Sequence, residues 1–374
     1  MVAAPIHFTG NVDFRMRLVL ATLSGRAIKI DRIRSDDLEP GLKDYEVSFL
    51  RLLEAVTNGS VIEISYTGTT VVYRPGLIVN GTITHNCPVS RAVGYFLEPI
   101  LLLSPFGKAA LNLTLKGVTS NGIDLGVDTI RAALFPVYQK FGIMRQELRV
   151  VKRGSLPLGG GEVSVFLPHV LLQPNTLHAA VKTPQVSKIR GTAYSTRVSP
   201  ASVNRIIDAA RGVLKVTGCE TFIYSDVARG EESGKSPGFG VSLVAETKSG
   251  WCYTAEGAGS AGEAPEDVGE RVARALLEEV AIGGMVGTTQ VKHLVVLMVL
   301  GKEDLGRVLI GGGVIDEAFV RLLRDIKLMW GTEVRIKQHE DAEVDEDGED
   351  GERPMEFVLT VKGVGFVNAT KKIA

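Results

Sequence analysis

Residues 199–226 read SPASVNRIIDAARGVLKVTGCETFIYSD. Ser199 is a favoured helix N-cap, and Pro200 suits the first helical position. Apolar side chains then recur every three or four residues, which predicts an amphipathic helix; they are Val203, Ile206, Ile207, Ala210, Val213 and Leu214. A β-rich run at 221–224 follows this helix. A helix followed at once by a strand indicates mixed α and β layers.

The same alternation extends along the chain. Spacing and caps predict further helices between Pro40-Gly41 and Asn58-Gly59, from Pro265, and from about Asp316. Strands are predicted at 61–66, 70–73, 111–115, 163–167, 241–245 and 294–300, with 357–361 pairing with 334–337. The rhythm indicates an α+β fold of repeated units of about 90 residues, each with a few strands and two helices.

One part of the chain has a pattern of its own. Residues 188–284 carry a separate β-α-β succession with their own cluster of turn residues. We therefore predict that 188–284 form an inserted smaller α/β domain, and that 1–187 and 285–374 together form the repeat domain.

Composition limits the class of protein. The chain has 374 residues, 45% of them hydrophobic, and three well-separated cysteines, which argues against a disulfide framework or a zinc module. No secretory signal opens the sequence, and the strongly apolar run at 294–300 is too short to cross a bilayer. We expect a soluble intracellular protein without a membrane partner.

The charge is unevenly distributed. Residues 340–352 carry nine acids and no base, so a formal charge of −1 for the chain leaves +8 on the other 361 residues. A basic body could meet a polyanion while an acidic loop at 340–352 stays clear of it. Ordinary surface variation with a disordered insertion explains the same numbers.

Glycine-rich strings suggest nucleotide loops, but their context argues against them. The segment 230–236, GEESGKS, lacks the glycine spacing of a P-loop and leads into a strand rather than a helix. The GxGxxG match at 257–262 precedes a helix that starts only at Pro265, which favours a plain loop. The triplets 159–161 and 311–313 are predicted to be tight turns.

The histidines offer no metal site, since none of the six pairs at ligand spacing, and His293 is predicted to be structural. On the last predicted helix, Arg321, Arg324 and Lys327 recur every three residues with Asp325 between them. Two cations and a carboxylate could bind or cleave RNA. A solvated helix face with an Arg321–Asp325 ion pair remains the alternative.

Six ordered strings resemble a known family. They are FRMRLVLATLSG (14–25), IRSDDLEPGL (33–42), YRPGLIVNG (73–81), KRGSLPLGGGEV (152–163), RGTAYSTRVSP (190–200) and SGKSPGFGVSLVAET (233–247). Together they are similar to the RNA 3′-terminal phosphate cyclase superfamily, and most to its cyclase-like branch in ribosome biogenesis. The resemblance implies units of two helices on a four-stranded sheet, like the C-terminal domain of bacterial translation initiation factor three, with one inserted α/β domain.

The resemblance also implies an activity that this sequence departs from. Cyclases adenylylate a histidine with ATP and pass the adenylate to an RNA 3′-phosphate, which then cyclises. The corresponding turn here, 309–314, contains no histidine, and none occurs between His293 and His339. The family's glycine-rich N-terminal motif is reduced to FTGNVDFR (8–15), which keeps Arg15, and its second basic position after Arg34 is Asp37.

We therefore expect a non-catalytic protein without a cofactor or a metal. The cyclase-like branch implies a nucleolar, hence nuclear, factor of the small-subunit processome, needed for early pre-rRNA cleavages towards 18S rRNA. Its implied partners are the assembly GTPase, pre-rRNA and the small nucleolar ribonucleoprotein. Candidate RNA or anion contacts are Arg15, Arg34, Arg321, Arg324 and Lys327. The alternatives are an endonuclease using Arg324, Asp325 and Lys327, and a surviving cyclase.

Overall fold

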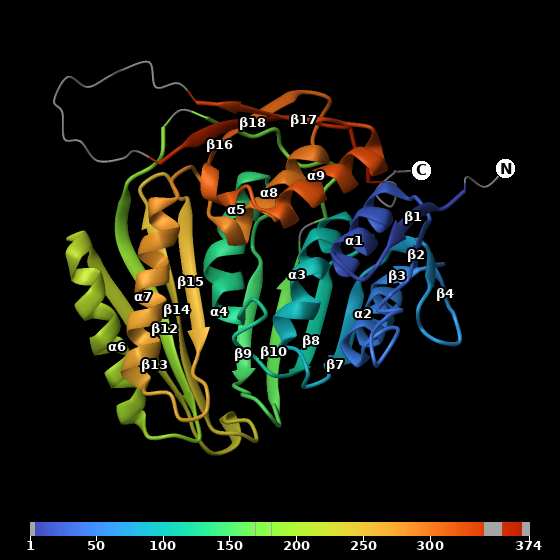
Figure 1. The fold of residues 1–374 in the computed structure, drawn as a ribbon. Helices are drawn as coiled ribbons and strands as arrows, with labels where there is room; N and C mark the ends of the chain where they lie inside the picture. The colour runs from blue at the N-terminus through green and yellow to red at the C-terminus, as the bar shows by residue number, and fades with distance from the viewer. Residues whose placement is uncertain (1–3, 169, 181, 340–353, 369–374) are drawn as a thin grey trace.

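Four four-stranded sheets and the helices packed on them make up the described chain (Figure 1). The computed structural model describes residues 4–168, 170–180, 182–339 and 354–368. The acidic segment 340–352 lies outside the described residues, so the prediction for it stays a prediction. A two-stranded ribbon, β3 (Thr57–Asn58) with β6 (Leu77–Ile78), completes the strands described.

Three of the sheets share one topology. Their strand orders are β1-β2-β5-β4, β7-β8-β10-β9 and β11-β16-β18-β17. In each, the first two strands are parallel and the remaining pairs are antiparallel. The strands are β1 (Ile6–Thr9), β2 (Ile28–Asp31), β4 (Val61–Ile64), β5 (Val71–Arg74), β7 (Gly81–Asn86), β8 (Leu111–Gly117), β9 (Glu147–Lys152), β10 (Gly161–Leu167), β11 (His178–Ala179), β16 (Leu305–Gly311), β17 (Val334–Gln338) and β18 (Glu356–Lys362).

Helices connect the strands of each unit in the same order. They are α1 (Phe14–Ser24) and α2 (Asp44–Val56) in the first unit, α3 (Val93–Leu103) and the broken helix α4 (Val127–Thr129), η2 (Ile130–Leu134) and α5 (Phe135–Lys140) in the second, and α8 (Thr288–Val299) and α9 (Glu317–Trp330) in the third. The predicted α+β class, with two helices on a four-stranded sheet, is confirmed.

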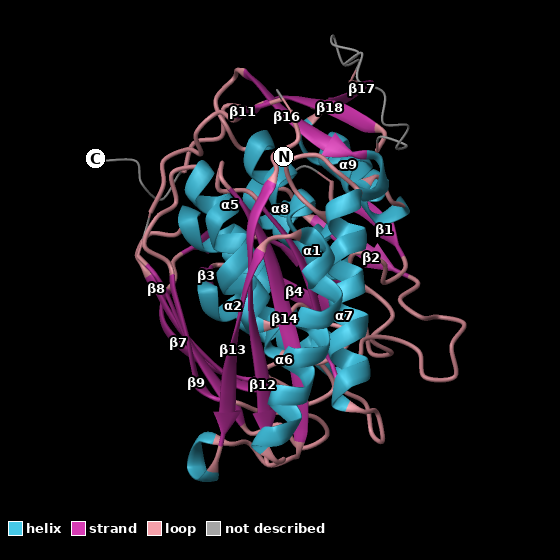
Figure 2. Ribbon diagram, turned by 90° about the vertical axis from the view of Figure 1, so that its left-hand side faces the viewer, coloured by secondary structure: helices cyan, strands magenta, loops and turns pink. Residues whose placement is uncertain are grey.

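The fourth sheet lies between β11 and α8 in the sequence. Its strands are β12 (Val186–Thr196), β13 (Glu220–Ala228), β14 (Gly238–Thr247) and β15 (Cys252–Ala258), in the order β13-β12-β14-β15. Figure 2 shows α6 (Pro200–Leu214) and α7 (Pro265–Ala281) along one side of this sheet. Its apolar side chains form a cluster separate from the main core. The predicted limits of the domain at 188 and 284 stay a prediction.

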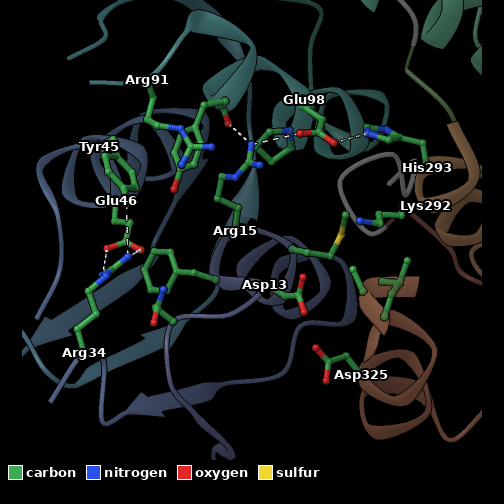
Figure 3. A pocket seen from close by; sticks show the side chains of 17 residues that line it. Asp13, Arg15, Arg34, Tyr45, Glu46, Arg91, Glu98, Lys292, His293 and Asp325 are labelled. Atoms are coloured by element: carbon green, nitrogen blue, oxygen red, sulfur yellow. Dashed lines mark hydrogen bonds and ion pairs between the residues drawn. The ribbon is translucent and has the colours of Figure 1, made fainter. Parts of the chain in front are cut away.

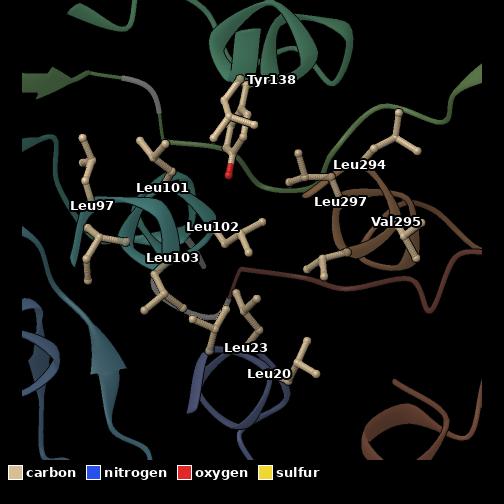
Figure 4. Close-up of a cluster of buried hydrophobic side chains, with 14 of the residues drawn as sticks. Leu20, Leu23, Leu97, Leu101, Leu102, Leu103, Tyr138, Leu294, Val295 and Leu297 are labelled. Carbon is tan, nitrogen blue, oxygen red and sulfur yellow. The ribbon is translucent and has the colours of Figure 1, made fainter. Parts of the chain in front are cut away.

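The main core lies where α1, α3 and α8 converge (Figure 4). Leu20, Leu102 and Leu297 from these three helices are fully buried there. The strand predicted at 294–300 was wrong, because 294–299 belong to α8 and Leu300 is its C-cap. A helix buried on all sides shows a continuous apolar run, and such a run of seven residues also suits a buried strand.

Local signals located the helices that were predicted. The Ser199 side chain accepts a hydrogen bond from the Ala201 N–H and Pro200 is the first residue of α6. Asp316 caps α9 through the Phe319 N–H.

The predicted pairing of 334–337 with 357–361 is confirmed. None of the described helices is both long and apolar enough to cross a bilayer.

A buried arginine joins the fourth sheet to the second unit. Arg153 follows β9, and its guanidinium donates to Asp128 of α4 at 2.5 Å and to Asp226 of β13 at 2.8 Å. It also stacks on the Tyr194 ring at 4.9 Å. These ion pairs raise the pKa of Arg153 against the opposing effect of burial. The junction is therefore held by a charge that both parts of the chain neutralise.

Glu256 is a second polar link at the same junction. Its carboxyl accepts hydrogen bonds from the Gly126 N–H at 2.6 Å and the Thr129 hydroxyl at 2.5 Å. Burial raises the pKa of Glu256 to about 7, and the nearby carboxylates of Asp128 and Asp124 add to the shift. The folded chain therefore keeps this proton at pH values where the unfolded chain has released it.

This raised pKa predicts a pH-dependent stability. Between about pH 4.5 and 7 the folded state binds the extra proton, so the free energy of unfolding falls as pH rises. From pH 5 to 7.5, wild type should lose about 2–3 kcal/mol relative to Glu256→Gln, whose amide does not titrate. Urea unfolding of both proteins across this range measures the difference. A constant difference would contradict the raised pKa.

Candidate functional site

A cavity of about 270 Å³ opens where the three units meet (Figure 3). It lies at the N-terminal parts of α1, α3 and α8, between the start of α2 and one face of α9. The charged residues that line it are Asp13, Arg15, Arg34, Glu46, Arg91, Glu98, Lys292 and Asp325, with His293 among them. Four cations and four carboxylates give the lining no formal net charge.

Arg15, one of the predicted anion contacts, lies in this cavity but is held by the protein. Its Nη1 donates to the Tyr95 carbonyl at 2.5 Å and lies 3.3 Å from the Glu98 carboxylate. The guanidinium also stacks on the Tyr95 ring at 4.0 Å. The Arg15 side chain is one quarter exposed, so one side of it remains open to a ligand.

Glu98 connects Arg15 to His293. Burial alone would raise the pKa of Glu98, but Arg15 and His293 lower it to about 2. His293 is fully buried; its Nδ1 is 2.8 Å from the Tyr138 hydroxyl and its Nε2 is 3.4 Å from Glu98. The prediction that His293 is structural is consistent with this geometry. An imidazole whose two nitrogens are both engaged is poorly placed to attack a phosphate.

Arg34 reaches the same cavity from the loop after β2. Its two terminal nitrogens lie 2.7 and 2.8 Å from the two oxygens of Glu46, and these hydrogen bonds raise the pKa of Arg34. Glu46 in turn accepts from the Lys43 N–H at the start of α2. Both side chains are almost buried, at 11% and 3% exposure. Arg34 therefore shapes the wall of the cavity more than it offers free charge.

Arg91 was not predicted from the sequence. It forms a forked ion pair with Asp124, and its guanidinium lies over the rings of Tyr45 and Tyr95. The side chain of its partner Asp124 is 1% exposed and also accepts a hydrogen bond from the Ala92 N–H at the start of α3. Arg91 thus fixes the two aromatic rings that line the cavity.

The structure separates the residues of the cluster predicted on the last helix. Arg324 and Lys327 are exposed, and Lys327 pairs with Glu333 at 2.7 Å. Asp325 is instead 5% exposed and pairs with the buried Arg17 at 3.0 Å. Burial raises the pKa of Asp325, although Arg17 opposes the shift.

The proposed Arg321–Asp325 pair was wrong. Arg321 contacts Asp13 at 2.6 Å and Glu317 at 2.8 Å, one turn earlier on α9. Asp325 points to α1, because it lies on the same buried face of α9 as the apolar residues that pack against α1. The three residues proposed for RNA cleavage therefore do not share one open face.

The glycine-rich turn at 309–314 is closely packed. A Cβ on Gly311 would meet the backbone of Ile282, and one on Gly313 would approach the Ile282 side chain. Neither glycine lines the cavity. The two glycine-rich strings at 230–236 and 257–262 also have the structures expected of them. Residues 230–236 lead into β14, and 257–262 form the end of β15 and a loop before α7.

The described residues contain no group of three or more His, Cys, Asp or Glu side chains placed to hold a metal ion. What the cavity offers is one open arginine, a lysine, and two tyrosine rings fixed by cations. Such a surface can bind a planar or anionic group.

The repeated units and the conserved order of their strands define a cyclase-type fold. The model of the RNA 3′-terminal phosphate cyclase family matches residues 6–336, and the chain belongs to this family. The resemblance read from the six strings is thereby confirmed.

Three similar proteins carry names of the rRNA-processing or cyclase-like branch of that family. The chain is 54% identical to the "rRNA processing protein RCL1" of Saccharomyces cerevisiae over 98% of its own length and 97% of the relative. It is 46% identical to the rRNA processing protein rcl1 of Schizosaccharomyces pombe, over 98% of each chain. It is 42% identical to the human "RNA 3'-terminal phosphate cyclase-like protein", over 99% of each chain.

Proposed function

We propose that this chain acts in rRNA processing as a non-catalytic member of the cyclase family. The observation that carries the proposal is its 54% identity, over nearly the full length of both chains, to a protein named for rRNA processing. The cavity supports it, since its histidine is engaged on both nitrogens and its cations other than Lys292 face carboxylates.

The finer proposal follows the family branch. The chain joins the small-subunit processome in the nucleolus and is needed for early pre-rRNA cleavages towards 18S rRNA. Its partners there are the assembly GTPase, pre-rRNA and the small nucleolar ribonucleoprotein. Exposed cations such as Arg324 and Lys327 are available for RNA contacts.

Depletion of the protein in its own cells tests the role. We expect precursors of 18S rRNA to accumulate, while the large-subunit rRNA is made at its usual rate. Re-expressed wild type should restore cleavage. Unchanged 18S production on depletion would contradict the role in rRNA processing.

A second experiment tests the absence of catalysis. Purified protein is incubated with a 3′-phosphorylated RNA, labelled ATP and Mg²⁺, and scored for adenylylated protein, cyclised ends and internal cuts. We expect none of the three. Adenylylation or cyclisation would revive the cyclase, whereas internal cuts would favour the nuclease and lead to tests of Asp325.

A further inference from the structure

A second cavity, of about 570 Å³, lies at the junction between the fourth sheet and the second unit. It is bordered by the end of β9, the residues after β12 and the loop after β13. That loop carries the GEESGKS string at 230–236, and none of its residues lines the first cavity. Lys152, Arg197 and Arg229 line this second cavity, with Glu231 as the acid among its lining residues.

The cations of this cavity are not neutralised by carboxylates. Within the described ranges, no carboxylate lies within ion-pair distance of Lys152, Arg197 or Arg229. Glu162, which is paired with Lys152 across β9 and β10, contacts Lys116 instead at 3.5 Å. In the first cavity, by contrast, three of the four cations have carboxylate partners. The second cavity therefore carries an excess of positive charge.

A buried hydroxyl without a protein partner lies in the wall of this cavity. Ser233 is 2% exposed and lines the cavity, yet its Oγ has no hydrogen-bond partner among the described residues. Burying such a group without a partner costs about 1–3 kcal/mol. An anion that reached this hydroxyl would accept a hydrogen bond from it and remove that cost.

The loop is fixed before any ligand arrives. The Gly234 N–H donates to the Arg153 carbonyl at 2.5 Å, and the Lys235 N–H donates to the Gly159 carbonyl at 2.9 Å. Arg197 Nε donates to the Gly234 carbonyl at 2.6 Å. A Cβ on Gly234 would collide with the Gly159 carbonyl, so glycine is required here for contact with the neighbouring turn. Arg197 and the loop that carries Ser233 are therefore held in place by backbone contacts.

We propose that this cavity binds a backbone phosphate of single-stranded RNA, an inference that rests on the proposed role in rRNA processing. Two aromatic side chains support a single strand as the ligand. Phe222 and Tyr224 lie two residues apart on β13 and so share one face of this strand, which ends at the cavity. Their side chains are 45% and 60% exposed. Bases of the same strand can stack on such rings, whereas bases in a duplex cannot.

The test measures binding of a fluorescently labelled 12-nucleotide RNA by anisotropy at several salt concentrations. The double variant Lys152→Gln/Arg229→Gln should bind about tenfold more weakly, with a salt slope smaller by roughly 0.7, because the contact with one phosphate of a single strand is lost. The matched control is Arg205→Gln/Arg274→Gln, which removes two exposed arginines from α6 and α7. It should bind within about twofold of wild type.

Ser233→Ala separates binding from folding. Because the hydroxyl has no partner in the protein, its removal should not lower the free energy of unfolding. RNA affinity should nevertheless fall by about tenfold, as expected for a lost hydrogen bond to a charged group. A variant that binds as wild type, or that is destabilised, would overturn the assignment of Ser233.

The outcomes distinguish this site from the proposed function. If wild type binds RNA and the Lys152/Arg229 variant binds equally well, the site is wrong and the role in rRNA processing stands. If wild type binds no RNA even at low salt, both the site and RNA contact by this chain are wrong. Competition by a phosphoserine peptide more strongly than by RNA would overturn RNA as the ligand.

Discussion

Asp325→Ala should lower the free energy of unfolding by about 3–5 kcal/mol. The mutation leaves the Arg17 guanidinium buried at 9% exposure without its carboxylate, and one Arg17 nitrogen already has no partner. A buried charge that loses its counter-ion bears the full cost of desolvation. Urea unfolding followed by circular dichroism measures the change.

Neighbouring variants supply the controls. Arg324→Ala and Lys327→Ala change exposed side chains on the same helix and should alter stability by no more than about 0.5 kcal/mol. Arg17→Ala, outside the predicted cluster, should destabilise as much as Asp325→Ala does. The double variant Arg17→Met/Asp325→Leu should recover most of the loss, because it removes both charges.

These results bear directly on the endonuclease alternative. A loss of RNA cleavage in an Asp325 variant would follow from unfolding alone, whatever the role of the carboxylate. Asp325→Asn keeps the size of the side chain and is the better probe of chemistry, provided that its fold is verified. If Asp325→Ala unfolds at the wild-type urea concentration, the buried pair contributes little and a chemical role gains weight.

Prediction from the sequence succeeded where the signal was local. Ser199-Pro200 and Asp316 located α6 and α9, because caps and the first helical turn lie within a few residues of each other. It failed for 294–300, where burial on every side removes the polar face that identifies a helix. A continuous apolar run does not distinguish a buried helix from a buried strand.

The candidate site was harder to predict than the fold. The six strings indicated Arg15 and Arg34, and both line the first cavity. The partners that neutralise them could not be derived, since Arg15 meets Glu98 at a separation of 83 residues. The burial of Asp325 likewise depends on Arg17, 308 residues away. Whether a charged residue is free or paired is decided by such distant contacts.

The two cavities differ in the respect that matters for RNA. In the first, most cations are paired with carboxylates, so their charges are already neutralised by the protein. In the second, Lys152 and Arg229 have no ion pair within the described residues, and the hydroxyl of Ser233 is unpartnered. The second cavity is therefore the better place to look for an RNA phosphate.

Arg153→Met should be as damaging as Asp325→Ala, with a loss of about 3–5 kcal/mol in the free energy of unfolding. Arg153 is 3% exposed, and its removal leaves the equally buried Asp128 with only the half-exposed Arg131 as a counter-ion. The same change frees Asp226 and so weakens the contact between the fourth sheet and the second unit. Urea unfolding measures the loss, and limited proteolysis reports whether residues 188–284 become more accessible to cleavage.

Arg131→Ala is the matched control, because it removes the other, exposed partner of Asp128 and should cost no more than about 1 kcal/mol. Arg153→Lys keeps the charge but loses the planar fork that contacts Asp128 and Asp226 together, so an intermediate loss is expected. If Arg153→Met is no worse than Arg131→Ala, the junction is held by apolar packing instead. In that case the loop at 229–236, which hydrogen-bonds to the Arg153 backbone, should keep its place and the RNA affinity of the variant should be unchanged.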